Sequence, residues 1–182
     1  HESEQSKDFA ESILKIKPTA IIGVSTVGGA FTQQVIENMS SINERPIIFP
    51  YSNPTSHSEC TAEQAYTWSK GKAIFASGSP FAPVTYNGKT FTPGQGNNVF
   101  IFPALGLAIY ATEAKRVTDE MLLTASEAVA EQITQDDFEN GLIYPPVKNI
   151  REVSINVAVK VAEEIFKSGL ARVKKPKDIK KF

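Results

Sequence analysis

The chain has 182 residues, of which 41% are hydrophobic and 21% charged, and its formal net charge is −1. This length is enough for one domain with a buried core. The balanced charge argues against partners such as nucleic acid or a membrane surface, because both call for a concentration of Lys and Arg. No apolar run approaches the roughly 20 residues that span a bilayer.

The cysteine content and the N-terminal sequence indicate the cellular compartment in which the protein is expected. The single cysteine, Cys60, cannot form an internal disulfide, which favours a reducing environment. The N-terminus shows no secretory signal peptide. We therefore expect a protein of the cytoplasm, or of the lumen of a mitochondrion or plastid, and not a secreted one. The chain also lacks an initiator Met, so we expect native residues before His1.

The first half of the chain alternates predicted helices with short buried strands. Apolar, β-branched runs predict parallel strands over 19–24, 46–49 and 73–76. Helical spacing and caps predict helices over 7–16, 31–39 and 61–69. Thr61 and Gln64 form a plausible capping box for the last of these helices. Strand, glycine turn, helix and strand make one βαβ unit.

The second half is predicted to be mainly helical after a β-hairpin. Asn87-Gly88 marks the hairpin turn within 84–91. The predicted helices cover 99–114, with Pro103 as an early interruption, and 119–133, 134–139 and 150–168. We expect the Lys-rich tail over 174–182 to be exposed and mobile, or to pack on an absent partner. The sequence shows no convincing internal domain boundary.

These elements predict an α/β fold with parallel strands first and a helical layer last. In such sheets the ligand lies at the carboxyl ends of the strands. The loops over 23–29, 52–55 and 77–80 each follow a predicted strand. We therefore expect these three loops to meet at one edge of the sheet.

Glycine and asparagine are the candidate ligand-binding residues at this edge. The turn over 23–29 could bring backbone N–H groups to a dinucleotide, or be an ordinary βα turn, since the G-x-G-x-x-G fingerprint is incomplete. Asn53 could bind a ligand or form an Asx turn. Asn97 and Asn98 could cap the next helix, bind a ligand, or divide these roles. An amide suits all of these because it carries both a donor and an acceptor.

Cys60 and His57 are weak candidates for a metal site or a nucleophile. The only other His is His1, there is no second Cys, and no third group is indicated that would orient a Cys–His pair. We expect Cys60 to be a small packed residue. The chain is therefore assigned no catalytic residue and no metal ligand.

Several long segments of this sequence resemble malic enzyme. The similarity runs from about residue 16 to residue 171, and the segments occur in the same order as in that family. They cover 41–49, 52–68, 75–81, 91–103 and 142–146. Among them are Ser-Asn-Pro-Thr around Asn53 and Pro-Gly-Gln-Gly-Asn-Asn ending at Asn98.

The resemblance implies a fold and an activity. The fold is a Rossmann-like parallel sheet flanked by helices, and residues 1–182 would be the C-terminal portion of the NAD(P)-binding domain, with 170–182 as a tail. The activity is oxidative decarboxylation of L-malate to pyruvate and CO2 with NAD or NADP and Mg or Mn, in a homodimer or homotetramer.

The resemblance also implies roles for particular residues. Asn53 would contact both malate and the nicotinamide end of the cofactor. Asn97 and Asn98 would hold the malate carboxylate, with Asn97 preferred. Gly23, Ser25 and Gly28 would line the path of the cofactor. One departure is Thr26, at a position where the family commonly has Gly, and it puts close backbone approach there in doubt.

The larger departure is what the chain lacks. The family's catalytic Tyr and Lys, its acidic metal ligands, its substrate Arg and its first glycine fingerprint all belong upstream of His1. Without a metal and a base–acid pair we expect the isolated chain to be inactive. The alternative is a stand-alone, non-catalytic module that binds a nucleotide or a partner.

Overall fold

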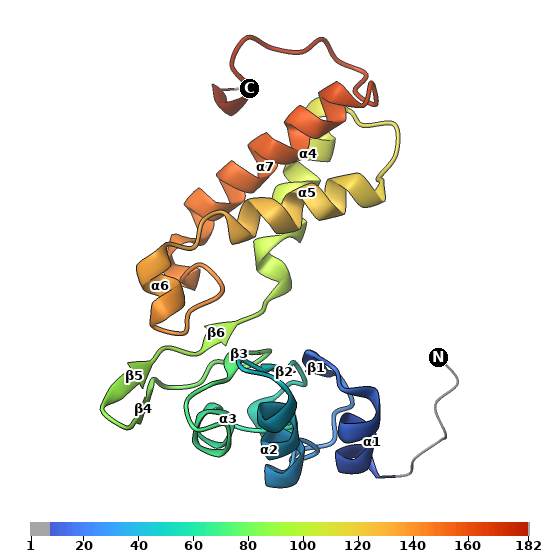
Figure 1. The fold of residues 1–182 in the computed structure, drawn as a ribbon. Helices are drawn as coiled ribbons and strands as arrows, with labels where there is room; N and C mark the ends of the chain where they lie inside the picture. Colours follow the sequence, from blue (N-terminus) through green and yellow to red (C-terminus); the bar gives the residue numbers. More distant parts are fainter. Residues whose placement is uncertain (1–7, 182) are drawn as a thin grey trace. The chain divides into compact units, whose positions relative to one another are not determined.

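The computed structural model describes residues 8–181. Lys7 of the predicted first helix and Phe182 of the tail lie outside the described residues. The chain divides into two compact units, a division that the sequence analysis did not predict. The first unit contains the residues up to Gly96 together with Gln135–Ile143, and the second contains Asn97–Thr134 and the residues from Tyr144 onward. Figure 1 shows the elements of each unit along the chain.

The first unit is built on a four-stranded sheet, and its strands pair in parallel in the order β1-β2-β3-β6. The strands are β1 (Ala20–Gly23), β2 (Ile47–Pro50), β3 (Ile74–Ser77) and β6 (Gly94–Gln95). This confirms the three predicted parallel strands and the α/β class. The sequence analysis missed β6, because a two-residue strand within a Pro-Gly-Gln-Gly segment has no apolar run.

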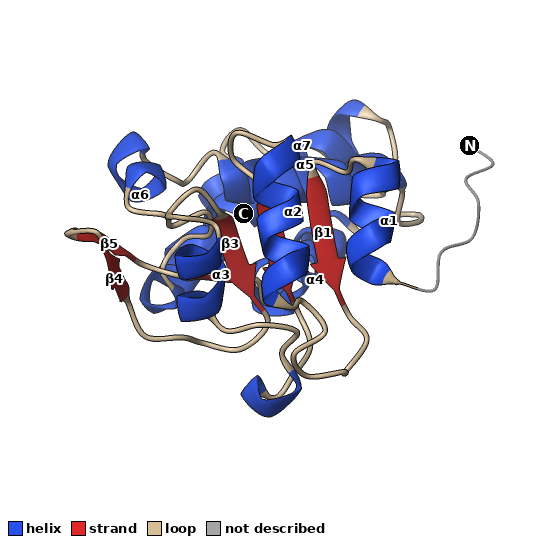
Figure 2. Ribbon diagram, turned by 60° about the horizontal axis from the view of Figure 1, so that its bottom comes forward, coloured by secondary structure: helices blue, strands red, loops and turns tan. Residues whose placement is uncertain are grey.

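Three helices lie side by side on one face of this sheet (Figures 1 and 2). They are α1 (Phe9–Ile16), α2 (Gln33–Ile42) and α3 (Ala62–Trp68). Side chains cap their first turns: Asp8 accepts from Ala10 N at 2.9 Å, and Thr61 with Gln64 forms the predicted capping box. The core between helices and sheet includes Ile36, Met39, Ile48, Tyr66 and Phe75.

A hairpin and a short helix complete the first unit. The antiparallel strands β4 (Val84–Tyr86) and β5 (Lys89–Phe91) flank the predicted Asn87-Gly88 turn, where both residues have positive φ. The helix is α6 (Gln135–Glu139), which the sequence also predicted. The hairpin packs inward through Phe91, whose ring stacks on Tyr66 with centroids 4.4 Å apart.

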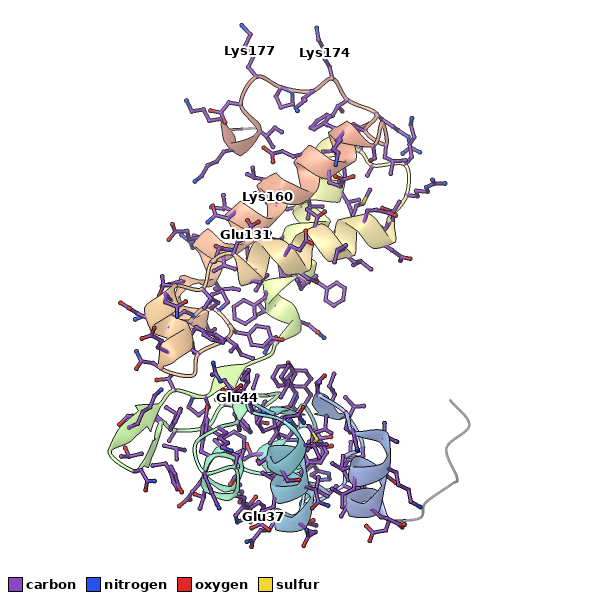
Figure 3. The ribbon with its side chains drawn as sticks, in the orientation of Figure 1. Glu37, Glu44, Glu131, Lys160, Lys174 and Lys177 are labelled. Atoms are coloured by element: carbon purple, nitrogen blue, oxygen red, sulfur yellow. The ribbon has the colours of Figure 1, made fainter. Side chains whose placement is uncertain are left out.

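The second unit is a layer of three helices. They are α4 (Phe102–Thr112), α5 (Asp119–Ala130) and α7 (Ile150–Lys167), and both α4 and α5 pack against α7. All three were predicted, although Pro103 lies in the first turn of α4, which begins at Phe102, and does not interrupt the helix. Their shared core includes Leu105, Met121, Val157, Val161 and Ile165. Across the surface of α5 and α7, Lys160 Nζ lies 3.4 Å from a Glu131 carboxylate oxygen (Figure 3).

The C-terminal tail was predicted to be exposed and mobile, or to pack on an absent partner, and the structure contradicts this in part. A short 3-10 helix over Ile179–Lys181 lies against α7, and Ile179 is half-buried there, so this part of the tail packs on its own chain. Lys174 and Lys177 are exposed and point away from the helices (Figure 3). None of the helices in the described part of the chain has the length and apolar character needed to cross a membrane.

Candidate functional site

Three loops leave the sheet of the first unit at the same edge, as the sequence predicted. They follow β1, β2 and β3, and backbone hydrogen bonds continue the ladder one step beyond the strands. Tyr51 N donates to Gly23 O at 2.8 Å, Gly78 N to Pro50 O at 3.1 Å, and Gly96 N to Ser77 O at 2.9 Å. This edge is the carboxyl end of the sheet, where α/β proteins place their ligands.

A buried carboxylate, Glu59, joins the first two of these loops. Its Oε1 accepts hydrogen bonds from Ser25 N and Ser25 Oγ, both at 3.0 Å, and from Ser52 Oγ at 2.5 Å. The Glu59 residue is only 1% exposed. Ser52 Oγ also accepts from Thr26 N at 2.8 Å, so the serine hydroxyl relays the contact to the next residue of the turn.

The environment of Glu59 favours its ionised form. Burial by itself raises the pKa of this carboxyl, but the hydrogen bonds from Ser52 and Ser25 outweigh it and bring the pKa below its ordinary value. Glu59 is therefore a carboxylate at neutral pH. Glu59 was not among the predicted site residues, because its partners lie 7 and 34 positions away and no local pattern marks a buried Glu.

The segment around Glu59 also holds the rest of the glycine turn. Phe31 N donates to Glu59 O at 2.9 Å, and Gly29 N donates to Ser58 O at 3.1 Å. His57 Nδ1 lies 3.0 Å from Thr26 O. The residues 52–59 and the turn over 25–31 therefore form one hydrogen-bonded structure at the edge of the sheet.

These contacts use backbone N–H groups that could otherwise face a phosphate. Ser25 N, Thr26 N and Gly29 N donate within the chain, and Val27 N lies 3.3 Å from Ser25 Oγ. The structure therefore argues against the interpretation in which these four N–H groups bind a phosphate of the cofactor. The cofactor contacts predicted for Gly23, Ser25 and Gly28 remain predictions.

Close packing explains two of the glycines without a ligand. A Cβ at Gly23 would collide with the carboxyl group of Glu59. A Cβ at Gly28 would lie 2.6 Å from Ser56 O. Thr26 has φ of 59° in this turn, a left-handed conformation that is costly for a β-branched residue. The structure thus gives a physical reason why Gly would suit the position that Thr26 occupies.

Asn53 is exposed at this edge, and neighbouring residues hold its side-chain amide by hydrogen bonds. Ser79 Oγ donates to Asn53 Oδ1 at 2.5 Å, and Asn53 Nδ2 donates weakly to Tyr51 O at 3.4 Å. Gly78 leaves room for this amide, because a Cβ there would lie 2.6 Å from Nδ2. These partners are not those of an Asx turn, which would bond N–H groups that follow Asn53. Oδ1 accepts from Ser79, and Nδ2 makes only the long contact with Tyr51 O, so one N–H of the amide has no hydrogen bond among the described residues.

Asn97 and Asn98 are the first two residues of the second unit. Asn97 Oδ1 accepts from Val99 N at 2.9 Å and caps the short 3-10 helix over Asn98–Phe100. Asn98 is exposed, and within the described part of the chain its side chain has no recorded hydrogen bond. The capping role is thus confirmed for Asn97, and the malate contacts of Asn97 and Asn98 remain predictions.

Cys60 is a buried core residue, as predicted. It is 1% exposed, and burial, reinforced by the neighbouring Glu59 charge, raises the pKa of its thiol to about 12. A thiol that stays protonated at neutral pH is neither a ready nucleophile nor a ready metal ligand. The described residues contain no group of three or more His, Cys, Asp or Glu side chains that could hold a metal ion.

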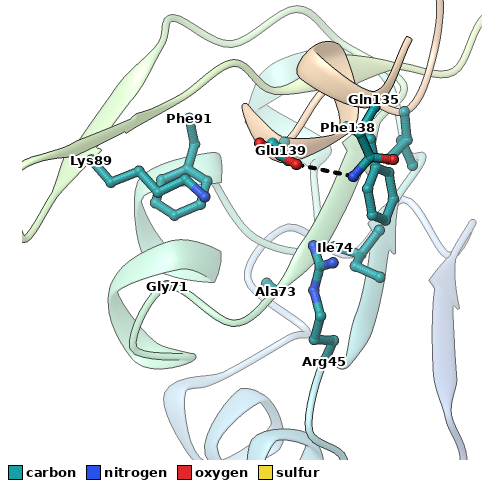
Figure 4. Close-up of a pocket in the computed structure, with 11 residues that line it drawn as sticks. Arg45, Gly71, Ala73, Ile74, Lys89, Phe91, Gln135, Phe138 and Glu139 are labelled. Atoms are coloured by element: carbon teal, nitrogen blue, oxygen red, sulfur yellow. Dashed lines mark hydrogen bonds between the residues drawn. The ribbon is translucent and has the colours of Figure 1, made fainter. Parts of the chain in front are cut away.

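A cavity of about 200 Å³ lies elsewhere in the first unit, between the hairpin, β3 and α6. Figure 4 shows Lys89 beside the Phe91 ring on one side of it and Arg45 with Phe138 on the other. Each cation lies about 5 Å from the centre of its ring. The buried lining residues, Ala73 and Phe91, are apolar, and the charged ones are exposed. No buried polar group in its lining indicates a ligand.

Comparison with known proteins identifies the family. Residues 1–166 match the sequence model of "Malic enzyme, NAD binding domain". An NADP-dependent malic enzyme from Vitis vinifera is 57% identical over 183 residues, covering 100% of this chain and 31% of the relative. A chloroplastic NADP-dependent malic enzyme from Zea mays is 58% identical and is covered to 29%. The chain thus spans less than a third of the length of these relatives.

Solved structures agree with the sequence comparison. A malic enzyme from Pyrococcus horikoshii is 28% identical with a TM-score of 0.68, over 90% of this chain and 34% of that one. A malic enzyme from Entamoeba histolytica is 25% identical with a TM-score of 0.75, over 96% of this chain and 32% of that one. The Rossmann-like class that the resemblance implied is thereby confirmed. The chain belongs to the malic enzyme family and represents part of its NAD-binding domain.

Proposed function

We propose that this chain is the C-terminal portion of the NAD(P)-binding domain of a malic enzyme, which oxidatively decarboxylates L-malate to pyruvate and CO2. The observation that carries the proposal is the 57% identity to an NADP-dependent malic enzyme over the whole chain. The parts that the chain lacks would lie elsewhere in the same protein, including the catalytic Tyr and Lys, the substrate Arg and the acidic ligands of Mg or Mn.

The geometry of Asn53 supports its proposed role at the substrate. With Oδ1 bonded to Ser79 Oγ and one N–H directed at Tyr51 O, the amide still has an N–H to donate at the carboxyl edge of the sheet. Donors of this kind suit the carboxylate or hydroxyl oxygen of malate and the carboxamide oxygen of nicotinamide. A neutral donor also orients these groups without adding charge, which is a positioning role. The bound nicotinamide cofactor would supply the hydride acceptor.

Asn97 and Asn98 are proposed to contact the malate carboxylate, with Asn98 now the preferred residue. Its side chain is exposed and has no recorded partner within the described residues. Asn97 retains its Nδ2 group, although its oxygen caps the following turn. Gly23, Ser25 and Gly28 are proposed to line the cofactor path, although Ser25 N already donates to Glu59.

Localisation and assembly extend this proposal. The Zea mays and Flaveria pringlei relatives are named as chloroplastic, so a plastid is among the compartments that we propose. A homodimer or homotetramer is proposed as the assembly of the whole protein. The exposed apolar residues of α4, which include Phe102, Leu107 and Tyr110, are compatible with contacts beyond this chain.

The test is an Asn53→Ala substitution in the full-length protein that contains this chain. We expect the wild type to reduce NAD or NADP only when malate and Mg or Mn are present. We expect Asn53→Ala to lower kcat/KM for malate by about 100-fold, since misplaced reactants lose rates of this order. The matched control is Asn87→Gly, in the exposed hairpin turn. Asn43→Ala would not serve, because the Asn43 side chain donates to Pro18 O.

Two outcomes would contradict the proposal. A wild-type protein that shows no malate-dependent reduction of either cofactor would favour a non-catalytic binding module instead. An Asn53→Ala variant with unchanged kcat/KM would leave the family assignment in place but would remove Asn53 from the substrate site.

A further inference from the structure

The Glu59 carboxylate is the point at which two loops of the proposed site meet. Ser25 belongs to the glycine turn proposed for the cofactor, and Ser52 is the neighbour of Asn53 in the loop proposed for malate. Both serines donate to the same oxygen, Glu59 Oε1, at 3.0 and 2.5 Å. Ser52 N also lies 3.4 Å from the second oxygen, Oε2. The Glu59 carboxylate therefore links the two loops directly, alongside the bond from Thr26 N to Ser52 Oγ.

Glu59 is held by hydrogen-bond donors alone. Among residues 8–181 no Lys or Arg forms an ion pair with it. Burying a charge without a cation is costly unless its oxygens are well hydrogen-bonded. The hydrogen bonds from Ser25 and Ser52 therefore fix the position of the Glu59 carboxylate, and the same bonds constrain the two serines.

The surrounding backbone leaves little freedom for this arrangement to shift. Glu59 O accepts from Phe31 N at 2.9 Å, so the same residue holds the turn at its far end as well. Gly23 packs directly on the carboxyl group, with no space for a Cβ between them. Glu59 therefore contacts both the start and the end of the turn.

We propose that Glu59 is a positioning residue, which sets the separation between the cofactor turn and the Asn53 loop for hydride transfer. This inference rests on the proposed function. Glu59 acts through Ser25 and Ser52 and does not itself touch the reacting atoms. The expected sensitivity is high, because a displacement of about 1 Å can cost a reaction on the order of 100-fold in rate.

The first experiment measures steady-state kinetics of Glu59→Gln in the full-length protein. Gln has the same shape but no charge. Its amide NH2 group would face the three donors from Ser25 and the Ser52 hydroxyl if it took the place of Oε1, or Ser52 N if it took the place of Oε2. We expect kcat to fall at least about tenfold. We also expect the isotope effect on kcat with malate deuterated at C2 to rise, because hydride transfer would become more rate-limiting. Glu63→Gln is the matched control, since Glu63 is an exposed carboxylate four residues along on α3.

The second experiment asks whether Glu59 acts through the serines. If it does, Ser52→Ala should produce a similar loss and a similar isotope effect, and the double variant should lose little more than Glu59→Gln alone. Losses that multiply in the double variant would overturn the proposal. Should Glu59→Gln fail to fold by circular dichroism, Ser25→Ala and Ser52→Ala decide the matter: wild-type kcat and isotope effect in both would overturn it.

The outcomes separate this inference from the proposed function. An inactive wild type would reject the proposed function, and the role of Glu59 would fall with it. An active wild type with an unchanged Glu59→Gln variant would reject only the role of Glu59. A variant that is folded, slow and marked by a raised isotope effect would support both.

Discussion

At the scale of single residues, Ser79 holds the Asn53 side chain through its amide oxygen. The residue is buried, with 5% of its surface exposed, and its hydroxyl donates to Asn53 Oδ1 at 2.5 Å. Ser77 Oγ in turn donates to Ser79 O at 2.7 Å and steadies the loop. Without the Ser79 donor, the Asn53 amide could rotate and present its oxygen in place of its N–H groups.

We therefore predict that Ser79→Ala impairs substrate binding more than folding. The expected result is a rise of about tenfold in KM for malate, since one oriented hydrogen bond contributes about 1 to 1.5 kcal/mol. The measurement is steady-state kinetics of the full-length protein. Ser126→Ala is the control, because Ser126 is an exposed serine whose hydroxyl bonds only within α5. An unchanged KM would show that Asn53 is oriented without Ser79.

Thr26 leads to a second prediction, which concerns stability. Its φ of 59° is costly for a residue with a Cβ and free for Gly. We expect Thr26→Gly to be more stable than Thr26→Ala by about 1 kcal/mol in the free energy of unfolding, measured by urea denaturation. Both variants lose the bond from Thr26 Oγ1 to Ser25 O, so their difference reports the backbone strain of Ala reduced by the larger unfolded-state entropy of Gly. Equal stabilities would mean that the turn relaxes around Thr26.

Glu59 leads to a third prediction, on pH. Its pKa is lowered in the folded chain, so its stabilising effect is fully present above the unfolded value of about 4.3 and is lost as pH falls through the folded pKa. The difference in unfolding free energy between wild type and Glu59→Gln should be constant near neutral pH and should shrink in acid. Denaturant titrations at several pH values measure this difference. A gap that widens as the pH falls would show that Glu59 is not held as a carboxylate.

At the scale of elements, local patterns predicted most of the structure. Short β-branched runs identified β1, β2 and β3, and the Thr61–Gln64 capping box identified the start of α3. The convergence of the three loops also followed from the sequence, because parallel strands end at the same edge. These features depend on residues that are close in the chain, so a pattern can record them.

Features that depend on distant contacts were not predictable in the same way. β6 exists because Gly94 and Gln95 pair with Ala76 and Ser77, and its own two residues carry no strand signal. The role of Glu59 depends on Ser25, which lies 34 positions away. The capping role of Asn97 was an open alternative, and only the bond to Val99 N decided it. The division at Gly96 likewise follows from which residues share a core.

At the scale of the whole chain, the two units have separate hydrophobic cores. Phe75 belongs to the core of the first unit and Ile165 to that of the second, and each is fully buried. We predict that Ile165→Ala raises amide hydrogen exchange in α4, α5 and α7 while the sheet strands stay protected, and that Phe75→Ala does the reverse. Each substitution should cost about 2 to 5 kcal/mol within its unit. Exchange that rises equally in both units would show that they unfold together.

The isolated chain provides the last prediction, which concerns the location of the chemistry. In its first unit, Ser79 bonds the Asn53 amide, and Ser52 bonds the buried Glu59 carboxylate. These are groups that we propose to orient a hydroxy acid and a nicotinamide. Oxidative decarboxylation also needs a proton acceptor and donor, and an electrophile that polarises the carbonyl of the oxidised intermediate. Glu59 is saturated with donors and Cys60 stays protonated, so neither is suited to these steps.

We therefore expect residues 1–182 alone to show no malate-dependent reduction of NAD or NADP, even with Mg or Mn present. The full-length protein assayed in parallel is the positive control, and circular dichroism verifies that the shorter chain is folded. Malate binding without turnover, measured by calorimetry, would place the orienting residues here and the reacting groups elsewhere. Turnover by the isolated chain would require a catalytic acid and base among its own side chains. It would contradict the proposal that the reacting groups lie in the rest of the protein.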